Sequence, residues 1–165
     1  MHTLNVLKFP DPGLRKKYIN VLRVGDRERE LLSKMAQTMY LSQGVGLAAI
    51  QVGSDLCMAV IDIGTGLMKL INPVITKKEG SEMQEEGCLS VPGTCVKVRR
   101  AKKVSISYMD EYGNTMKLKA VGLLARVMQH EIDHLSGKLI IDYLNPIKKL
   151  FIKPDKIRKK NLTFP

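Results

Sequence analysis

Hydrophobic residues recur at helical spacing in two stretches of the chain. The first stretch, residues 27–40, predicts an amphipathic helix with Asp26 as its N-cap. The second, residues 122–136, predicts a stronger helix that stops at Gly137. One face of this second helix carries Leu123, Val127, His130 and His134. We therefore expect both histidines to face the protein interior rather than water.

Shorter apolar or alternating segments predict strands. They cover residues 56–63, 67–71 (stopped by Asn72-Pro73) and 94–100. Residues 103–109 and 115–121 flank a turn at residues 110–114, which predicts a hairpin. The strands come before the central helix. We therefore expect an α+β fold, a compact single domain with mostly antiparallel sheets around that helix.

The end of the chain differs in composition from the rest. Asn145-Pro146 predicts the start of a last short helix, and Pro154 should interrupt it. From Lys148 to Lys160 the chain holds seven basic residues and one acid, Asp155. We therefore divide it into a catalytic domain, residues 1–147, and a basic C-terminal segment, residues 148–165.

Composition narrows the functional classes. The chain has 165 residues, of which 44% are hydrophobic and 26% charged, as in ordinary globular proteins. No apolar run approaches a membrane span, and the N-terminus does not resemble a signal peptide. Three widely spaced cysteines predict a reducing, cytoplasmic setting.

The formal net charge is +11, which suggests an anionic partner such as RNA. On charge alone a solvated basic surface is the preferred interpretation. Neither DNA nor a membrane is expected as a partner.

The sequence Gln129-His130-Glu131-Ile132-Asp133-His134 contains an H-E-x-x-H motif. Two histidines four positions apart lie on one face of a helix, where they can bind one metal ion with Glu131 beside them to move protons. The motif predicts metal-assisted hydrolysis. The alternative is a pair of buried histidines hydrogen-bonded within the core.

A catalytic metal site of this type normally has a third protein ligand. The metzincin pattern would place a histidine at position 140, which is Ile140, and the only acids after the motif are Asp142 and Asp155. We therefore expect the third ligand upstream of the motif.

Three cysteines are candidates for this ligand. Cys57 lies in an apolar strand, where a buried thiol is the default, and Cys95 shares a strand face with charged residues. Cys88 lies in a turn, between Gly87 and Pro92-Gly93, that can present its side chain to a cleft. Two imidazoles and the Cys88 thiolate would leave one metal position open for water.

Residues 44–51 form a third constellation, Gly-Val-Gly-Leu-Ala-Ala-Ile-Gln. A phosphate loop would need a lysine after its glycines, which is missing. The remaining alternatives are close backbone packing, or a substrate-facing loop with Gln51 aimed at a carbonyl.

Together, residues 44–51, 86–90 and 129–137 resemble the three motifs of the peptide deformylases, in the same order. The similarity runs from about Leu4 to Leu150. It implies hydrolysis of the N-formyl group from the initiator methionine of new polypeptides, so N-formylmethionyl nascent chains are the expected substrates. It also implies metal ligation by Cys88, His130 and His134, with Fe²⁺ as the usual native ion and Zn²⁺, Ni²⁺ or Co²⁺ as substitutes.

The resemblance assigns further roles. Glu131 matches the general acid/base that acts on a metal-activated water, and Gln51 and the Leu89 N–H match the groups that hold the formyl oxygen. The substrate backbone is expected to extend along Val45-Gly46 and Gly87. The methionine pocket is expected to be lined by Val45, Leu123, Val127 and His130. Glu86 and Arg100 are expected to pair in support of the cysteine loop, the alternative being a surface ion pair.

Three features depart from the family pattern or are common to only some members. Arg126 stands where members often carry an apolar residue, so we expect it either to narrow the pocket entrance or to extend to solvent. Cys95 stands where several members have a basic residue. In some members a basic C-terminal helix docks on the ribosome; for residues 148–165 a frayed terminus is the alternative.

Two rival functions remain. One is a small zincin-type metallopeptidase that cuts internal peptide bonds, and the other is an RNA- or ribosome-binding protein with a structural metal. The upstream Cys88 argues against the first. The second gives Glu131 and Gln51 no role.

Overall fold

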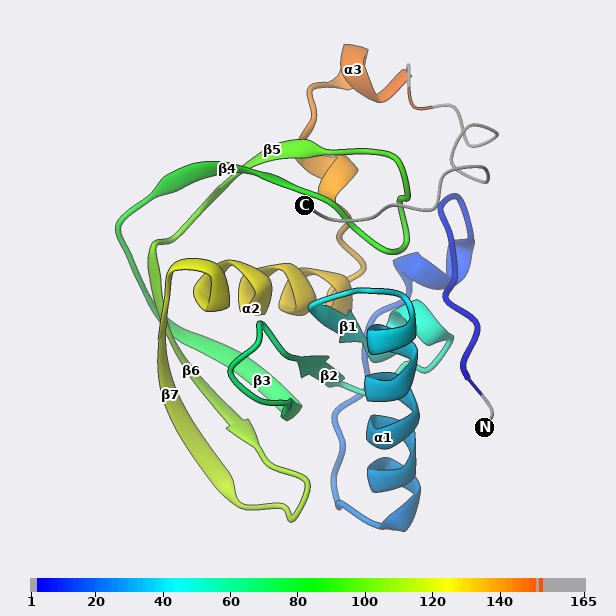
Figure 1. Ribbon diagram of the computed structural model, residues 1–165, viewed down its shortest axis with the longest axis vertical. Coiled ribbons are helices and arrows are strands. Elements are labelled where there is room, and N and C mark those ends of the chain that lie inside the picture. The colour runs from blue at the N-terminus through cyan, green and yellow to red at the C-terminus, as the bar shows by residue number, and fades with distance from the viewer. Residues whose placement is uncertain (1–2, 151, 153–165) are drawn as a thin grey trace.

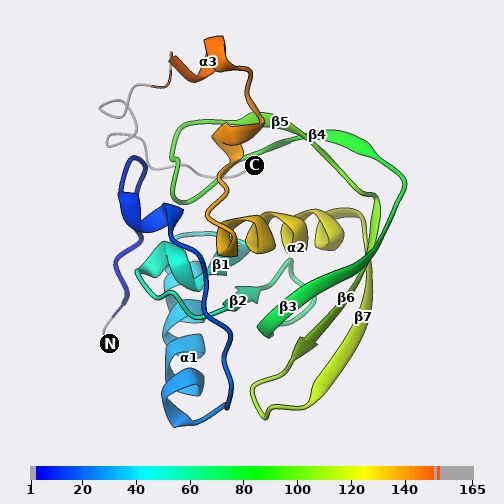
Figure 2. The same cartoon turned by 180° about the vertical axis from the view of Figure 1, so that it is seen from behind.

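Helix α2 (Gly122–Leu135) runs through the middle of the fold, between a large sheet and a small one (Figure 1). The computed structural model describes residues 3–150 and 152. Helix α1 (Asp26–Leu41) packs at one end of the large sheet. Seen from behind, α2 again lies between the two sheets (Figure 2). The α+β prediction with antiparallel sheets around the motif helix is confirmed.

The large sheet has five antiparallel strands in the order β1-β2-β3-β6-β7. Their bounds are β1 (Gly46–Ala48), β2 (Met58–Ile61), β3 (Met68–Glu79), β6 (Lys103–Met109) and β7 (Thr115–Val121). The small sheet is the antiparallel pair β4 (Glu82–Glu86) and β5 (Val96–Arg100). The hairpin predicted at residues 103–121 is confirmed, with Ile106 opposite Leu118.

The core forms where α2 and α1 cover the large sheet. Val104, Ile106 and Ala120 of the hairpin pack against Ala125 and Met128 of α2. A second cluster joins α1 to β1 and β2 through Leu32, Met35, Met39, Leu47, Met58 and Val60. Burial of these side chains fixes the orientation of α2, and with it the direction of the motif.

Strand β3 corrects one prediction. Asn72-Pro73 does not stop the strand, which continues to Glu79. Asn72 has a φ of 50°, and the pairing with β6 shifts register between Ile71 and Val74. This irregularity accommodates the proline, because a bulge needs no ladder hydrogen bond from Pro73. The Asn72 side chain also holds the adjacent chain: its Oδ1 accepts from Val21 N at 2.9 Å and its Nδ2 donates to Val21 O at 2.8 Å.

Two strands were not predicted, because neither has an apolar alternation. Strand β4 is almost entirely polar, and β1 has only three residues within a stretch expected to be a loop. The N-cap of α1 is Gly25 rather than Asp26; the Glu28 carboxylate accepts from Gly25 N at 2.8 Å. Asp26 is the first helical residue, where its negative charge suits the helix dipole.

The C-terminal part begins as expected. Residues Ile140–Tyr143 form a 3₁₀ helix, η3, and α3 (Pro146–Leu150) follows, with Asn145 Oδ1 accepting from Lys148 N at 2.8 Å. Pro154 and the basic residues from Lys153 onward lie outside the described residues. Among the described helices, none combines the length and apolar character needed to cross a membrane.

Replacing Asn72 with alanine should destabilise the protein by roughly 2–3 kcal/mol, since two partly buried hydrogen bonds to Val21 and a residue tolerant of positive φ are lost together. Urea denaturation measures this as a lower midpoint at unchanged slope. Asn20→Ala, an exposed neighbour of Val21, is the matched control and should have little effect. Equal midpoints for the two variants would contradict the role of Asn72.

Candidate metal centre and substrate pocket

The H-E-x-x-H helix and the loop after β4 bring together three side chains that could hold a metal ion. His130 and His134 point the same way from successive turns of α2, and Cys88 approaches from the loop. The distance from His134 Nε2 is 3.0 Å to His130 Nε2 and 3.2 Å to Cys88 Sγ. The ligand atoms of all three residues lie within 4.8 Å of one another.

This geometry fits a divalent metal ion. Ligand atoms about 2.0–2.3 Å from one tetrahedral ion lie roughly 3.3–3.7 Å apart, close to the observed separations. The His130 ring also bonds through Nδ1 to Glu86 Oε2 at 3.0 Å, which leaves Nε2 free to face the ion. The Oε2 atom of the neighbouring Glu131 is buried and has no hydrogen-bond partner within the described part of the chain. Such a group is expected where a reacting molecule binds.

The Glu86 carboxylate is the centre of a buried charge network. Arg100 binds both of its oxygens at 2.9 Å, and Arg126 Nη1 donates to Oε1 at 2.6 Å. Burial by itself would raise the pKa of Glu86, but the hydrogen bonds from His130 and Arg100 prevail and lower it to about 2. The expected pair of Glu86 with Arg100 is therefore present, and it is not a surface ion pair: both side chains are buried.

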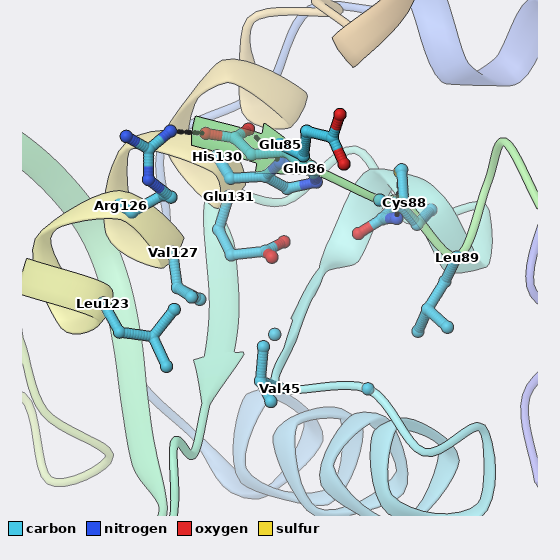
Figure 3. Close-up of a pocket in the computed structure, with 14 residues that line it drawn as sticks. Val45, Glu85, Glu86, Cys88, Leu89, Leu123, Arg126, Val127, His130 and Glu131 are labelled. Atoms are coloured by element: carbon cyan, nitrogen blue, oxygen red, sulfur yellow. Dashed lines mark hydrogen bonds and ion pairs between the residues drawn. The ribbon is translucent and has the colours of Figure 1, made fainter. Parts of the chain in front are cut away.

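Arg126 corrects one of the two expectations made for it. It does not extend to solvent, because only 6% of the residue is exposed, and it forms part of the pocket wall. Its guanidinium turns away from the open pocket toward Glu86 (Figure 3), and donates to the carbonyls of Val98 and Glu82 at 3.1 Å. An apolar residue at this position would leave these acceptors without the donor.

Glu131 is placed close to the backbone of β1. The residue is buried, and burial is the main cause that raises its pKa to about 7. A Cβ at Gly46 would lie 2.8 Å from Glu131 Cδ and 3.0 Å from its Cγ, and still closer to Oε1. Only glycine therefore fits at position 46 without displacing Glu131.

Gln51 is held with its amide nitrogen toward the metal ligands. Its Oε1 accepts from Ala48 N at 2.8 Å, and its Nε2 donates to Ser90 Oγ at 3.1 Å. The same Nε2 lies 3.7 Å from Cys88 Sγ. The side chain is thus fixed from both ends, with its donor beside the thiolate.

A pocket of about 290 Å³ opens beside these residues. Val45, Leu123 and Val127 point into it, with the Glu131 carboxylate at its inner side (Figure 3). Val45 and Leu123 are also exposed apolar side chains, 42% and 53%, as a pocket for an apolar group requires. The pocket wall includes every residue predicted for the site except His134, namely Val45, Gly46, Gln51, Glu86, Gly87, Cys88, Leu89, Leu123, Val127, His130 and Glu131. His134 lies beside Cys88, 1% exposed.

Two further residues support the site without having been predicted from the sequence. The Ser90 hydroxyl accepts a hydrogen bond from the Gln51 amide, and the sequence signal for this role is its position two residues after Cys88. Lys8 donates from Nζ to the Leu89 carbonyl at 2.5 Å, a contact across 81 residues for which the sequence holds no local signal. Cys57 is buried and Cys95 is exposed, as predicted.

Known proteins share this arrangement of motifs. Residues 3–150 match the family model described as polypeptide deformylase. A peptide deformylase from Pseudoalteromonas translucida is 46% identical over 163 residues, which span 97% of this chain and 95% of that protein. The chain belongs to the polypeptide deformylase family.

Solved deformylases have the same fold. The crystal structure of a peptide deformylase from Legionella pneumophila matches with a TM-score of 0.91 and 40% identity over 96% of each chain. A peptide deformylase from Ehrlichia chaffeensis, crystallised in complex with actinonin, matches with a TM-score of 0.90 and 36% identity over 99% of this chain and 100% of that one.

Family membership decides the class of reaction. Deformylases are metal-dependent hydrolases that remove the N-formyl group from polypeptides, so the predicted reaction is confirmed and neither rival function is favoured. That these enzymes depend on a metal agrees with the cluster of Cys88, His130 and His134.

Replacing Gly46 with alanine should lower the kcat/KM for deformylation by about 100-fold or more, because the new methyl group displaces the Glu131 carboxylate. The bound metal should remain, which metal analysis of the purified variant would show. Gly44→Ala is the matched control: the tightest contact of its methyl group would be the flexible end of Leu89, 2.8 Å away, and Glu131 is not among its neighbours, so the loss of kcat/KM should be smaller. Wild-type turnover in Gly46→Ala would contradict the placement of Glu131.

In the metal-free protein, the contribution of Glu131 to stability should be lost as the pH rises from about 4.5, its ordinary pKa, to about 7, its pKa in the folded state. Between these values the folded state holds the proton more tightly than the unfolded chain, so rising pH favours unfolding. Glu131→Gln has no titrating group at this position. The free energy of unfolding of the metal-free variant should exceed that of metal-free wild type by on the order of 2–3 kcal/mol at pH 8, and the two should be equal near pH 4. Urea denaturation across this pH range measures the difference; no gain at pH 8 would contradict the raised pKa.

Proposed function

We propose that this deformylase hydrolyses N-formylmethionyl peptides at the pocket between α2 and the loop after β4. The observation that carries the proposal is the convergence of Cys88, His130 and His134 beside the buried Glu131 carboxylate, at the inner end of an apolar pocket. The products are formate and a peptide with a free amino terminus.

Cys88, His130 and His134 would hold the metal ion as three ligands and leave one position open. The bound ion would supply Lewis acidity, which makes a water molecule available as the nucleophile at neutral pH by lowering its pKa from about 15.7 toward about 7. Fe²⁺ is the proposed native ion, with Zn²⁺, Ni²⁺ or Co²⁺ as substitutes. The donor set of one thiolate and two imidazoles supports soft or borderline metals of this kind.

Glu131 is proposed as the general acid/base. Its carboxylate takes the proton of the attacking water and delivers it to the departing amine nitrogen. The pKa of about 7 supports both roles, because such a group accepts and donates a proton with similar ease near neutral pH. The unpartnered Oε2 is an available acceptor.

Gln51 and Leu89 are proposed to hold the formyl oxygen. As the formyl carbon becomes tetrahedral, this oxygen gains negative charge, and a preorganised donor is worth roughly 3–4 kcal/mol. Two observations support these donors. The Gln51 amide is fixed by Ala48 and Ser90, and the Leu89 N–H has no acceptor among residues 3–150 and 152.

The substrate backbone is proposed to lie along β1 as an added strand. Strand β1 is at the edge of the large sheet, so one of its sides is free to pair. Val45 O accepts from Asp62 N at 2.9 Å on the β2 side. Successive residues of a strand direct their backbone groups to opposite edges, so those of Gly46 face the free edge. Gly87 lines the opposite wall, and Val45, Leu123 and Val127 would receive the methionine side chain.

Three wider expectations stay predictions. A cytoplasmic location rests on the cysteines, which are all free in the structure. A ribosome contact through residues 148–165 rests on their charge, and most of that segment lies outside the described residues. The division into a catalytic domain, residues 1–147, and this segment also rests on the composition of the segment and stays a prediction.

The proposal is tested by assaying formate release on anaerobically purified protein with a formyl-methionyl tripeptide and with an internally cleavable peptide. We expect formate from the first substrate and no cleavage of the second. Glu131→Ala should keep its metal and lose roughly 10²–10⁴-fold in kcat. Full turnover in this variant with metal bound would show that Glu131 is not the acid/base.

Cys88→Ala tests the ligand set in the same preparation. The variant should bind metal far more weakly than wild type, because one of three ligands is gone. Cys95→Ala, an exposed cysteine outside the cluster, is the matched control and should keep wild-type metal content. Retention of metal at wild-type affinity by Cys88→Ala would exclude Cys88 as a ligand.

A further inference from the structure

The small sheet forms one wall of the pocket and α2 forms the other. Glu85, Glu86 and Gly87 lie on the first wall, and Leu123 and Val127 on the second. The width of the pocket therefore depends on how the β4–β5 pair is held against the helix. A two-stranded sheet is marginally stable by itself, so this contact matters.

Apolar packing holds the small sheet on the side away from the first turns of α2. Val96 and Val98 of β5 belong to a cluster with Ile140 and Ile141 of η3. Toward α2, the described contacts of the small sheet are polar and pass through long side chains. Two of them involve Arg100 and Glu86, which reach Asp133 and His130 in the second half of the helix.

Gln129 of α2 also exchanges two hydrogen bonds with the backbone of Ala101, directly after β5. Arg126 makes a further polar contact, and it joins both strands to the first half of α2. Its Nη1 donates to Glu86 Oε1 at 2.6 Å and to the Val98 carbonyl of β5 at 3.1 Å. Its Nη2 donates to the Glu82 carbonyl of β4 at 3.1 Å. Figure 3 shows its guanidinium aimed at Glu86 rather than into the space between Leu123 and Val45.

Since these acceptors occupy the guanidinium, Arg126 acts on the pocket through what it holds rather than by binding the substrate. Arg126 joins the two walls through these hydrogen bonds, and both Arg126 and Val127, the next residue along α2, line the pocket. A loss of this link would let the small sheet move away from α2.

We propose that Arg126 is a positioning residue that sets the width of the pocket, and with it the selectivity of the deformylase for the N-terminal side chain. The proposal rests on the deformylase activity. It also predicts that the two arginines have different functions: Arg100 holds Glu86 against His130, and Arg126 holds the small sheet against α2.

The test compares Arg126→Met with wild type on formyl-Met-Ala-Ser and formyl-Phe-Ala-Ser, at equal metal content. Methionine keeps much of the side-chain length and removes every donor. We expect the ratio of kcat/KM for the methionine over the phenylalanine substrate to fall about tenfold, through a higher KM for the methionine peptide rather than a lower kcat. Metal affinity, measured by chelator competition, should stay within about twofold, because Arg100 still holds Glu86. A tenfold change corresponds to about 1.4 kcal/mol.

Arg99→Met is the matched control. Arg99 lies on the exposed side of β5, and among the described residues its side chain forms one hydrogen bond, to Ser81 Oγ at 3.4 Å. Its replacement removes the same charge from the small sheet, outside the network around Glu86, and should leave the substrate ratio unchanged. An equal fall in this control would assign the effect to net charge and overturn the proposal.

Arg126→Lys covers the case in which Arg126→Met does not fold. Lysine brings one ammonium group to three acceptors, so the ratio should fall about threefold. An unchanged ratio in the folded variant overturns the proposal, as does loss of metal or of thermal stability without a change in the ratio. Absence of formate release from wild type on either peptide would instead contradict the deformylase function.

Discussion

The buried Glu86 carboxylate is the interaction on which the site depends. A carboxylate away from water is costly unless it is paired and hydrogen-bonded, and Glu86 is both: Arg100, Arg126 and His130 all bind it. Arg100 comes from β5, whereas Arg126 and His130 come from successive turns of α2. Because one charged group joins the small sheet, the motif helix and a metal ligand, their relative positions are fixed together.

A second constraint is the close approach of β1 to α2. Glu131 fits beside β1 only because Gly46 has no side chain, and Gln51 is oriented by the backbone N–H of Ala48 in the same strand. The proposed acid/base, the proposed oxyanion donor and the proposed substrate-binding edge are thus set by one short strand. This explains why a three-residue element with little hydrophobic signal has so much effect on the chemistry.

The helices and the hairpin were predictable because their apolar spacing is regular. Strand β4 was not, since it is polar and takes its conformation from pairing with β5. The end predicted for β3 was wrong for a related reason: Asn72 adopts a positive φ that the bulge and the contact with Val21 stabilise. The extension of Arg126 to solvent was wrong, because its partners Glu86, Val98 and Glu82 are 28 to 44 residues away in sequence.

The sequence by itself determined the chemistry. His130 and His134 are four positions apart, which fixes their common face by local geometry alone, and the order of the three motifs identified the family. Only the tertiary structure decided how Cys88 meets the histidines, which side chain Arg126 binds and how Gln51 is oriented. These contacts join residues far apart in the chain. Packing and the pairing of buried charges, rather than local propensity, determine which of them form.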